Sequence, residues 1–273
     1  MPSTFIIGEG EVPVYAHSGV IAALSPPLER LINGPMAEGT TGKVIFQALE
    51  VEDFDRICEF AYRGDYTVPK PATFDKEDVN PRIASLKYED PVGSVYHDSE
   101  ADDYEVPGGG DSEPNDAAIG HLPGYFRKKK YPLVGWTRKQ FARIAAIESN
   151  SHWTQDFAPV FLGHARLYTF AHMYMIAELR NLALHKLHRT LMWFTLYGSG
   201  CSAIVELARY AYYPDFLPGR QEGQIDQLRQ LVVEFVLLNV EHFIQEDLHR
   251  DLLGQGGEYA ADLLDMMAKW RSG

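Results

Sequence analysis

A succession of short apolar segments near the N-terminus, separated by turn and capping residues, constrains the fold more than any other feature of this sequence. The segments at residues 5–7 and 12–15 flank Gly8-Glu9-Gly10-Glu11, which predicts a β-hairpin. Pro13 has no backbone N–H to donate to a neighbouring strand, so the second strand is expected at the edge of a sheet. The strands of the fold are therefore expected at the beginning of the chain.

Two short helices and a further strand are expected next. Ser18 can cap the first helix. Ser25 followed by Pro26-Pro27 can open the second helix, and Asn33-Gly34-Pro35 can end it. The uninterrupted apolar run at residues 44–46 favours a short buried strand over a surface strand.

The segment from Asp53 to Arg63 is predicted to be an amphipathic helix. Its apolar residues recur at the spacing of one helical face, namely Phe54, Ile57, Cys58, Ala61 and Tyr62. Gly64-Asp65 is expected to end this helix. Tyr66-Thr67-Val68 is then expected to form a last short strand.

From about residue 71 to 158 the sequence loses its periodicity. Pro and Gly become frequent, eight acids without a Lys or Arg lie within residues 98–116, and seven bases without an acid lie within residues 127–143. A long loop adds little to the cost of folding, because closure entropy grows only logarithmically with loop length. We therefore interpret residues 71–158 as a largely disordered insertion that projects from a loop, with a short local helix at 141–147.

After this insertion the sequence predicts helices only. Apolar residues recur at helical spacing in two helices within 160–195 and in a short helix at 204–211. A helix at 224–246 is apolar on nearly all sides through its middle, which is typical of a buried helix. The last helix is expected at 259–270, with Ala260, Leu263, Leu264 and Met267 facing inward. Strands first and helices afterwards indicate the α+β fold class.

The order of these elements and the residues at their joints resemble a BTB/POZ domain, an intracellular protein-interaction module. His17 and the Ser25-Pro26 step stand where the family ends a strand and then a helix, and Phe46 matches its central strand. The next helix is similar to the family's closing signature of Phe-x-Tyr-x-Gly-x-Tyr at Phe60, Tyr62, Gly64 and Tyr66. After the insertion, the family's following helix pair is matched by Ala165, Tyr168, Ala171, Tyr174, Ile176 and Leu179.

The resemblance covers residues 5–70 and 160–195 and implies that they form one BTB/POZ-like domain, with a short-stranded sheet flanked by helices. The long polar insertion at 71–158 and the helical extension at 196–273 resemble those of many fungal BTB proteins. The resemblance implies a scaffold or adaptor that works by binding other proteins and is not an enzyme. It implies no cofactor, no catalytic residue and no metal ligand.

The segment Met36-Ala37-Glu38 resembles the hydrophobic-x-Glu loop with which many BTB adaptors engage a cullin ubiquitin-ligase scaffold. An apolar anchor such as Met36 can fill a groove, and the Glu38 carboxylate can set the register of the contact. An ordinary exposed loop would also explain these residues. Tyr62 is expected on the same face, so the predicted partner-binding residues are Met36, Glu38 and Tyr62.

The N-terminus argues against an exchanged-strand homodimer. BTB domains that dimerise by exchange carry an extra helix and strand upstream of the hairpin, whereas four residues precede Phe5 in this sequence. The N-terminus also lacks the basic and apolar regions of a secretory signal. The most apolar run, at 231–240, is too short and too interrupted to span a membrane.

Composition narrows the function and the compartment. A formal net charge of −13 disfavours partners such as nucleic acid or an anionic membrane. Two cysteines without a CxxC spacing are too few for a disulfide framework, which indicates a reduced, intracellular protein. The expected location is therefore the cytoplasm, the nucleus or both.

Two further interpretations fit the sequence. A BTB-type transcriptional regulator would recruit corepressors and use Arg127-Lys128-Lys129-Lys130 for nuclear import, although attraction to the acidic block at 98–116 explains this run equally well. No zinc-finger spacing or other DNA-reading motif accompanies it. An enzyme or metal site would have only the pairs His185/His188 and His242/His249 as support, and polar helix faces explain these histidines.

Overall fold

The computed structural model describes residues 2–34, 43–74, 122–133, 149–213, 216–220 and 223–272. The chain divides into two compact units. Unit 1 consists of Met1–Thr67, Pro132–Gly135 and Arg166–Ala183, and unit 2 consists of Val68–Tyr131, Trp136–Ala165 and Leu184–Gly273. Short strands combined with many helices place the molecule in the α+β class, as the sequence predicts.

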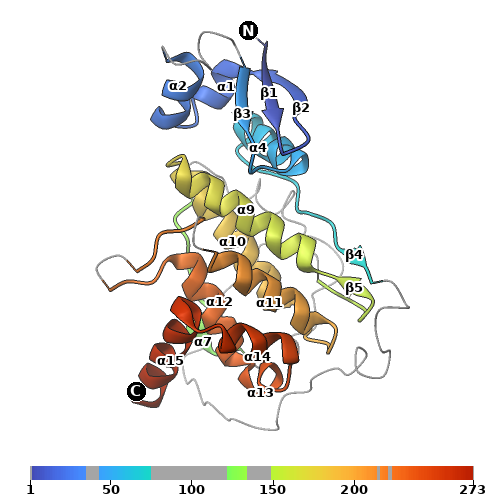
Figure 1. Ribbon diagram of the computed structural model, residues 1–273, viewed down its shortest axis with the longest axis vertical. Coiled ribbons are helices and arrows are strands. Elements are labelled where there is room, and N and C mark those ends of the chain that lie inside the picture. Colours follow the sequence, from blue (N-terminus) through green and yellow to red (C-terminus); the bar gives the residue numbers. More distant parts are fainter. Residues whose placement is uncertain are drawn as a thin grey trace. The chain divides into compact units, whose positions relative to one another are not determined.

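Three short strands form the sheet of unit 1 in the described residues. They are β1 (Pro2–Ile7), β2 (Val12–His17) and β3 (Lys43–Phe46), in the order β2-β1-β3 (Figure 1). β1 and β2 form the predicted antiparallel hairpin, and β3 pairs with β1 in parallel. β2 lies at an edge of this sheet, which confirms the position predicted from Pro13.

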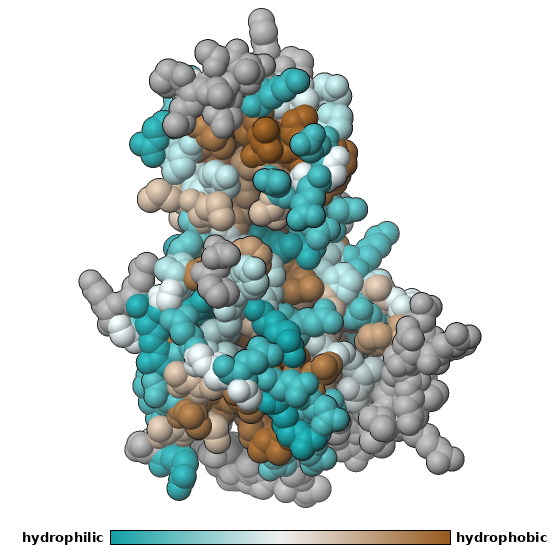
Figure 2. Space-filling model, in the orientation of Figure 1, coloured by the Kyte–Doolittle hydropathy of each residue, from teal (hydrophilic) through white to brown (hydrophobic). Residues whose placement is uncertain are grey.

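Side chains of this sheet alternate between a buried and an exposed face. Phe5, Ile7, Val44 and Phe46 are buried, whereas Ile45 is 62% exposed. Apolar residues are visible at the surface of unit 1 in Figure 2. The predicted strand at 44–46 is confirmed, but it is buried on one face only, because an uninterrupted apolar run does not reveal which face of a strand remains exposed.

In the chain, α1 (Ser18–Ala22) and α2 (Pro26–Asn33) lie between β2 and β3, and α4 (Val51–Arg63) follows β3. Ser25 caps α2 as predicted, since its Oγ accepts a hydrogen bond of 3.4 Å from the backbone N–H of Leu28. Ser18 is the first residue of α1 instead of its cap, and His17 occupies the N-cap position. Gly64 ends α4 with φ of 73°, a left-handed conformation that glycine adopts without steric cost.

Residues 66–68 do not form the predicted strand, because acidic side chains engage the backbone donors there. The Asp65 carboxylate accepts a hydrogen bond of 2.7 Å from the backbone N–H of Tyr66. The Glu59 carboxylate accepts one of 2.6 Å from the backbone N–H of Thr67. Such local bonds compete with the pairing that a strand requires.

A segment from the middle of the chain completes the core of unit 1. The ring of Phe46 packs edge-on against Phe170 and Tyr174, with centroids 5.6 Å apart in both pairs. The buried carboxylate of Asp53 accepts a hydrogen bond from Nε of Arg166, 113 positions away in the sequence. Arg166 and Phe170 belong to α9 (Ala158–Met173), so this helix contributes both apolar and ionic contacts to the core.

Unit 2 is built mainly from helices. They include α7 (Gly124–Arg127), α11 (Gly200–Ala211), α12 (Gln227–Leu238), α13 (Val240–Phe243), α14 (Asp247–Gly254) and α15 (Gly257–Ser272). Helix α10 (Ala177–Trp193), like α9, contributes residues to both units. The short strands β4 (Ala72–Thr73) and β5 (Gln155–Asp156) pair antiparallel, and α12 packs against α11 and α15. None of the helices in the described part of the chain combines the length and apolar character needed to cross a bilayer.

The helix predicted at 224–246 is divided in two, and α14 was not predicted at all. The division falls at Asn239, between α12 and α13. Nδ2 of Asn239 donates a hydrogen bond of 2.9 Å to the carbonyl oxygen of Phe235. A side chain that bonds to the preceding turn in this way competes with the regular helical ladder.

The buried face of α15 differs from the predicted one. Tyr259, Asp262, Leu263 and Met266 are buried, whereas Leu264 and Met267 are exposed. Asp262 is charged and lies inside, although it was not among the residues predicted to face inward. Its carboxylate accepts hydrogen bonds from Tyr212 (2.8 Å) and Arg220 (2.6 Å), and these partners make its burial tolerable.

Residues 122–133 lie within the stretch interpreted as an insertion, and the structure describes them. The ring of Phe126 in α7 is fully buried and packs edge-on against His188, with centroids 5.0 Å apart. Nζ of Lys129 lies 2.8 Å from the Glu234 carboxylate. This part of the stretch therefore packs against α10 and α12. The predicted helix at 141–147 and the acidic block at 98–116 lie outside the described residues.

Candidate functional site

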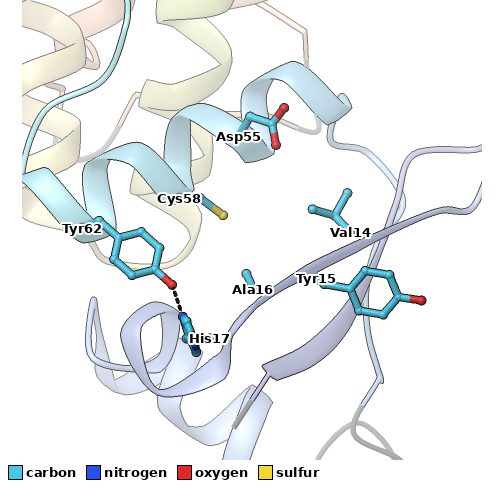
Figure 3. A pocket seen from close by; sticks show the side chains of 7 residues that line it. All are labelled: Val14, Tyr15, Ala16, His17, Asp55, Cys58 and Tyr62. Carbon is cyan, nitrogen blue, oxygen red and sulfur yellow. Dashed lines mark hydrogen bonds between the residues drawn. The ribbon is translucent and has the colours of Figure 1, made fainter.

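A groove on unit 1 lies between β2 and α4 and is open to solvent (Figure 3). It is lined by Val14, Tyr15, Ala16, His17, Asp55, Cys58 and Tyr62. Its volume is about 260 Å³, which is below the range of ~300–1,000 Å³ that is typical of small-molecule sites.

Helical spacing explains the α4 side of the groove. Asp55, Cys58 and Tyr62 lie three and four residues apart, so they fall on one face of the helix. The other face carries the buried residues Phe54 and Ile57. The same amphipathic pattern thus holds α4 on the core and presents a row of side chains to the groove.

Strand alternation explains the β2 side. Val14 and Ala16 are half-buried, whereas Tyr15 between them is 74% exposed and points away from the groove (Figure 3). His17 ends β2, and its Nδ1 shares a hydrogen bond of 2.5 Å with the hydroxyl of Tyr62. This bond joins the two walls at one end and holds the Tyr62 ring, which is 53% exposed, at the rim.

A buried ionic cluster positions α4. The Asp53 carboxylate accepts hydrogen bonds from Arg56 (2.9 Å) and from Arg166. Burial nevertheless raises the pKa of Asp53, because the cost of removing a carboxylate from water outweighs the attraction of the two guanidinium groups. The cluster ties α4 to α9, so the groove face of α4 is held by a rigid contact on the opposite side.

The groups in the groove are suited to non-covalent contacts. Partial burial and the nearby Asp55 carboxylate raise the pKa of Cys58 to about 11, so its side chain is a thiol and not a nucleophilic thiolate at neutral pH. Across the residues that the structure describes, no three His, Cys, Asp or Glu side chains come together as ligands for a metal ion.

The predicted partner-binding residues fall in different places. Tyr62 lies in the groove. Met36 and Glu38 belong to residues 35–42, which lie outside the described part of the chain. Sequence reasoning did not single out Asp55 as a site residue, although its spacing of seven residues from Tyr62 on one helix was a signal that could have identified it.

The histidines of unit 2 were interpreted as residues of polar helix faces, and for His188 and His249 this was wrong because both are buried. His249 is linked through Nδ1 to the carbonyl oxygen of Phe243 (3.0 Å) and through Nε2 to the hydroxyl of Tyr259 (2.8 Å). Burial lowers the pKa of His185 and His188 to about 4, and the neighbouring Arg189 contributes. Both rings are therefore neutral at pH 7.

Comparison with protein-family models, with curated proteins and with solved structures found no match to this chain. Its function must therefore be inferred from its own residues and geometry.

Proposed function

We propose that unit 1 is a BTB/POZ-like protein-interaction module and that the chain acts as a scaffold or adaptor in the cytoplasm or nucleus. It would bring other proteins together by surface burial and would carry out no covalent chemistry. The order of elements supports this proposal. A hairpin ends at His17, α1 leads to the Ser25-Pro26 step, and β3 is followed by α4, which closes at Gly64.

The groove between β2 and α4 is the observation that carries the proposal. Its walls are held by the core of unit 1 and by the His17–Tyr62 hydrogen bond, so little ordering is needed when a partner binds. Tyrosine is enriched at the centres of protein interfaces, because its ring buries a large apolar area and its hydroxyl can still bond. The exposed ring of Tyr62 fits this role.

We further propose that the segment containing Met36 and Glu38, which joins α2 to β3, contacts a cullin-type ubiquitin-ligase scaffold. The support is the resemblance of Met36-Ala37-Glu38 to the hydrophobic-x-Glu loop of BTB adaptors. In this arrangement Met36 would anchor the contact and Glu38 would pair with a basic group of the scaffold. The groove would then be available to a second protein, the substrate.

Retention of the chain on an immobilised cullin N-terminal domain tests the adaptor function. Glu38→Arg is expected to reduce retention at least about tenfold, since it places a like charge opposite the basic group. Glu9→Arg is the matched control, because it makes the same charge reversal at an exposed turn residue of unit 1 and should leave retention unchanged. Equal retention of Glu38→Arg and the wild-type chain would rule out the proposed contact between Glu38 and the cullin.

The alternative, a BTB-type transcriptional regulator that recruits corepressors, is supported by the exposure of Arg127, Lys128 and Lys130. Lys129 of the same run is paired with Glu234 in unit 2, which leaves three bases for an importin-like partner. Replacing these three by Ala is expected to shift a fluorescent fusion out of the nucleus if the run directs import. An unchanged distribution would count against this function.

A further inference from the structure

The order of groups along the groove defines the kind of partner segment that it can hold. Asp55 stands at one end, Cys58 and Ala16 form an apolar floor, and the bonded pair Tyr62 and His17 closes the other end (Figure 3). Asp55 is exposed, so its carboxylate is accessible to a partner. Of the seven lining residues, none is a lysine or an arginine.

The dimensions of the groove fit a short extended peptide. Asp55 and Tyr62 are seven residues apart on α4, and a rise of about 1.5 Å per residue separates their backbones by about 10 Å. An extended chain advances about 3.3 Å per residue, so about three residues span this length. The volume of about 260 Å³ is also too small for a helix, whose diameter with side chains is about 10 Å.

The negative charge of Asp55 decides which side chain of a partner can lie at this end of the groove. A carboxylate at the rim of an apolar groove attracts a cation and repels an acidic segment, and the formal net charge of −13 strengthens this selection at long range. The apolar floor requires a side chain without charge, because burying a charge against Cys58 and Ala16 would leave it without a partner. A partner segment therefore needs one cationic and one apolar side chain, on neighbouring or next-neighbouring residues, to contact Asp55 and the apolar floor.

We propose that the groove binds an extended segment of a partner protein of about three residues, with a Lys or Arg against Asp55 and a compact apolar side chain between Cys58 and Ala16. This deepens the proposed function, on which it rests, by naming the chemistry of the substrate segment. The ring of Tyr62 supplies an aromatic wall beside the apolar side chain. The ion pair selects the partner, and apolar burial supplies most of the affinity.

Selection from a phage-displayed library of random peptides tests this assignment on the full-length chain. The wild-type chain is expected to enrich peptides in which Lys or Arg lies within two residues of an apolar residue. Asp55→Asn should lose the preference for Lys and Arg, and a synthetic peptide of the enriched sequence should bind this variant about fivefold more weakly. Glu52→Gln removes an exposed charge from the same helix outside the groove and should bind like the wild-type chain.

Two further measurements make the outcome decisive. Cys58→Phe fills the floor of the groove and should abolish peptide binding, with circular dichroism and the thermal midpoint confirming that the variant is folded. Raising the salt concentration should weaken peptide binding to the wild-type chain more than to Asp55→Asn, because only the former includes an ion pair. No enrichment by the wild-type chain, or the same Lys and Arg preference in Asp55→Asn, would overturn the proposal.

The same variants separate this proposal from the adaptor function. Asp55→Asn and Cys58→Phe should be retained on the cullin domain like the wild-type chain, since neither changes Met36 or Glu38. If the wild-type chain is not retained on the cullin domain but still selects peptides, the adaptor function is ruled out and the groove assignment is retained. Intact cullin retention without peptide selection would support the adaptor function and overturn the groove assignment.

Discussion

Two groups of polar side chains, one in each unit, differ in how far they are exposed. In unit 1, Asp55 and Tyr62 are exposed around a groove. In unit 2, Arg229 and Asp262 are buried and bonded on several sides. A buried charge is tolerated only when it is paired, so Arg229 and Asp262 are engaged within the fold, whereas Asp55 at the groove is accessible to a partner. Exposure and pairing, and not charge alone, therefore distinguish a binding surface from a structural cluster.

The cluster around Arg229 shows how complete this pairing is. Its Nε donates to the carbonyl oxygen of Ala211 (3.0 Å), its Nη1 to the Glu258 carboxylate (2.5 Å) and its Nη2 to the carbonyl oxygen of Leu217 (3.3 Å). The guanidinium also lies 4.7 Å from the ring centroid of Tyr212. These contacts join α11, α12 and α15 and use all three nitrogens of the guanidinium.

Arg229→Ala is expected to have the largest effect on stability. It leaves two buried carbonyl groups without a donor and opens a cavity in unit 2, which should lower the free energy of unfolding by about 3–5 kcal/mol. Urea unfolding followed by circular dichroism measures this loss. The matched control is Arg250→Ala, which removes an exposed arginine paired with Asp247 and should cost less than about 1 kcal/mol. Equal losses in the two variants would contradict the contrast between buried and exposed charges.

Acidification is also expected to destabilise the fold, through His185 and His188. The pKa of both rings is lowered from 6.5 to about 4, chiefly by burial. Below pH 6.5 the unfolded chain binds protons that the folded chain does not, so the contribution of each ring is complete above pH 6.5 and is lost as the pH falls toward 4. The loss approaches about 3 kcal/mol for each ring as an upper bound.

Variants isolate these rings from the other groups that titrate at low pH. The groups that face His185 and His188 are Lys186 and Arg189 on α10 and Lys129 and Tyr131 in the 122–133 segment, and Lys129 is itself paired with Glu234 on α12. Unfolding free energies of the variant His185→Gln/His188→Gln should depend less on pH between 6.5 and 4 than those of the wild-type chain. His152→Gln changes an exposed histidine and should keep the wild-type profile. If the double variant keeps the wild-type pH dependence of the unfolding free energy, these two rings do not cause the loss of stability at low pH.

Tyr62→Phe is expected to have the smallest effect on stability. It removes the hydrogen bond to His17, but both groups are exposed and water can replace the lost partner, so the cost should be below about 1 kcal/mol. Tyr66→Ala, four residues away, removes a buried ring and should cost about 3–5 kcal/mol. Thermal unfolding compares the two variants. A cost for Tyr62→Phe near that of Tyr66→Ala would mean that Tyr62 serves the fold and not a binding surface.

Local patterns predicted the elements of unit 1 well. The hairpin follows from the Gly-containing turn at 8–11, the cap of α2 from Ser25, and the end of α4 from Gly64. The prediction for 66–68 failed because Asp65 and Glu59 engage the backbone there. Of the predicted site residues, Tyr62 lies in the groove, where Asp55 and Cys58 join it from the same helix face.

Contacts between distant segments decide the burial of polar side chains in unit 2. His188 was interpreted as a residue of a polar helix face, and an acid such as Asp262 ordinarily remains in water as well. Tyr212 and Arg220 bond to Asp262, and Phe126 covers His188. No local sequence pattern indicates such partners, because they are distant in the chain.

The sequence by itself determined the hairpin of β1 and β2, the cap of α2 at Ser25 and the end of α4 at Gly64, because caps, turns and apolar periodicity act over a few neighbouring residues. Only the tertiary structure decided which polar side chains are buried and which remain exposed around the groove. That choice depends on partners far away in the chain, such as Arg166 for Asp53, whose bonds offset the cost of leaving water.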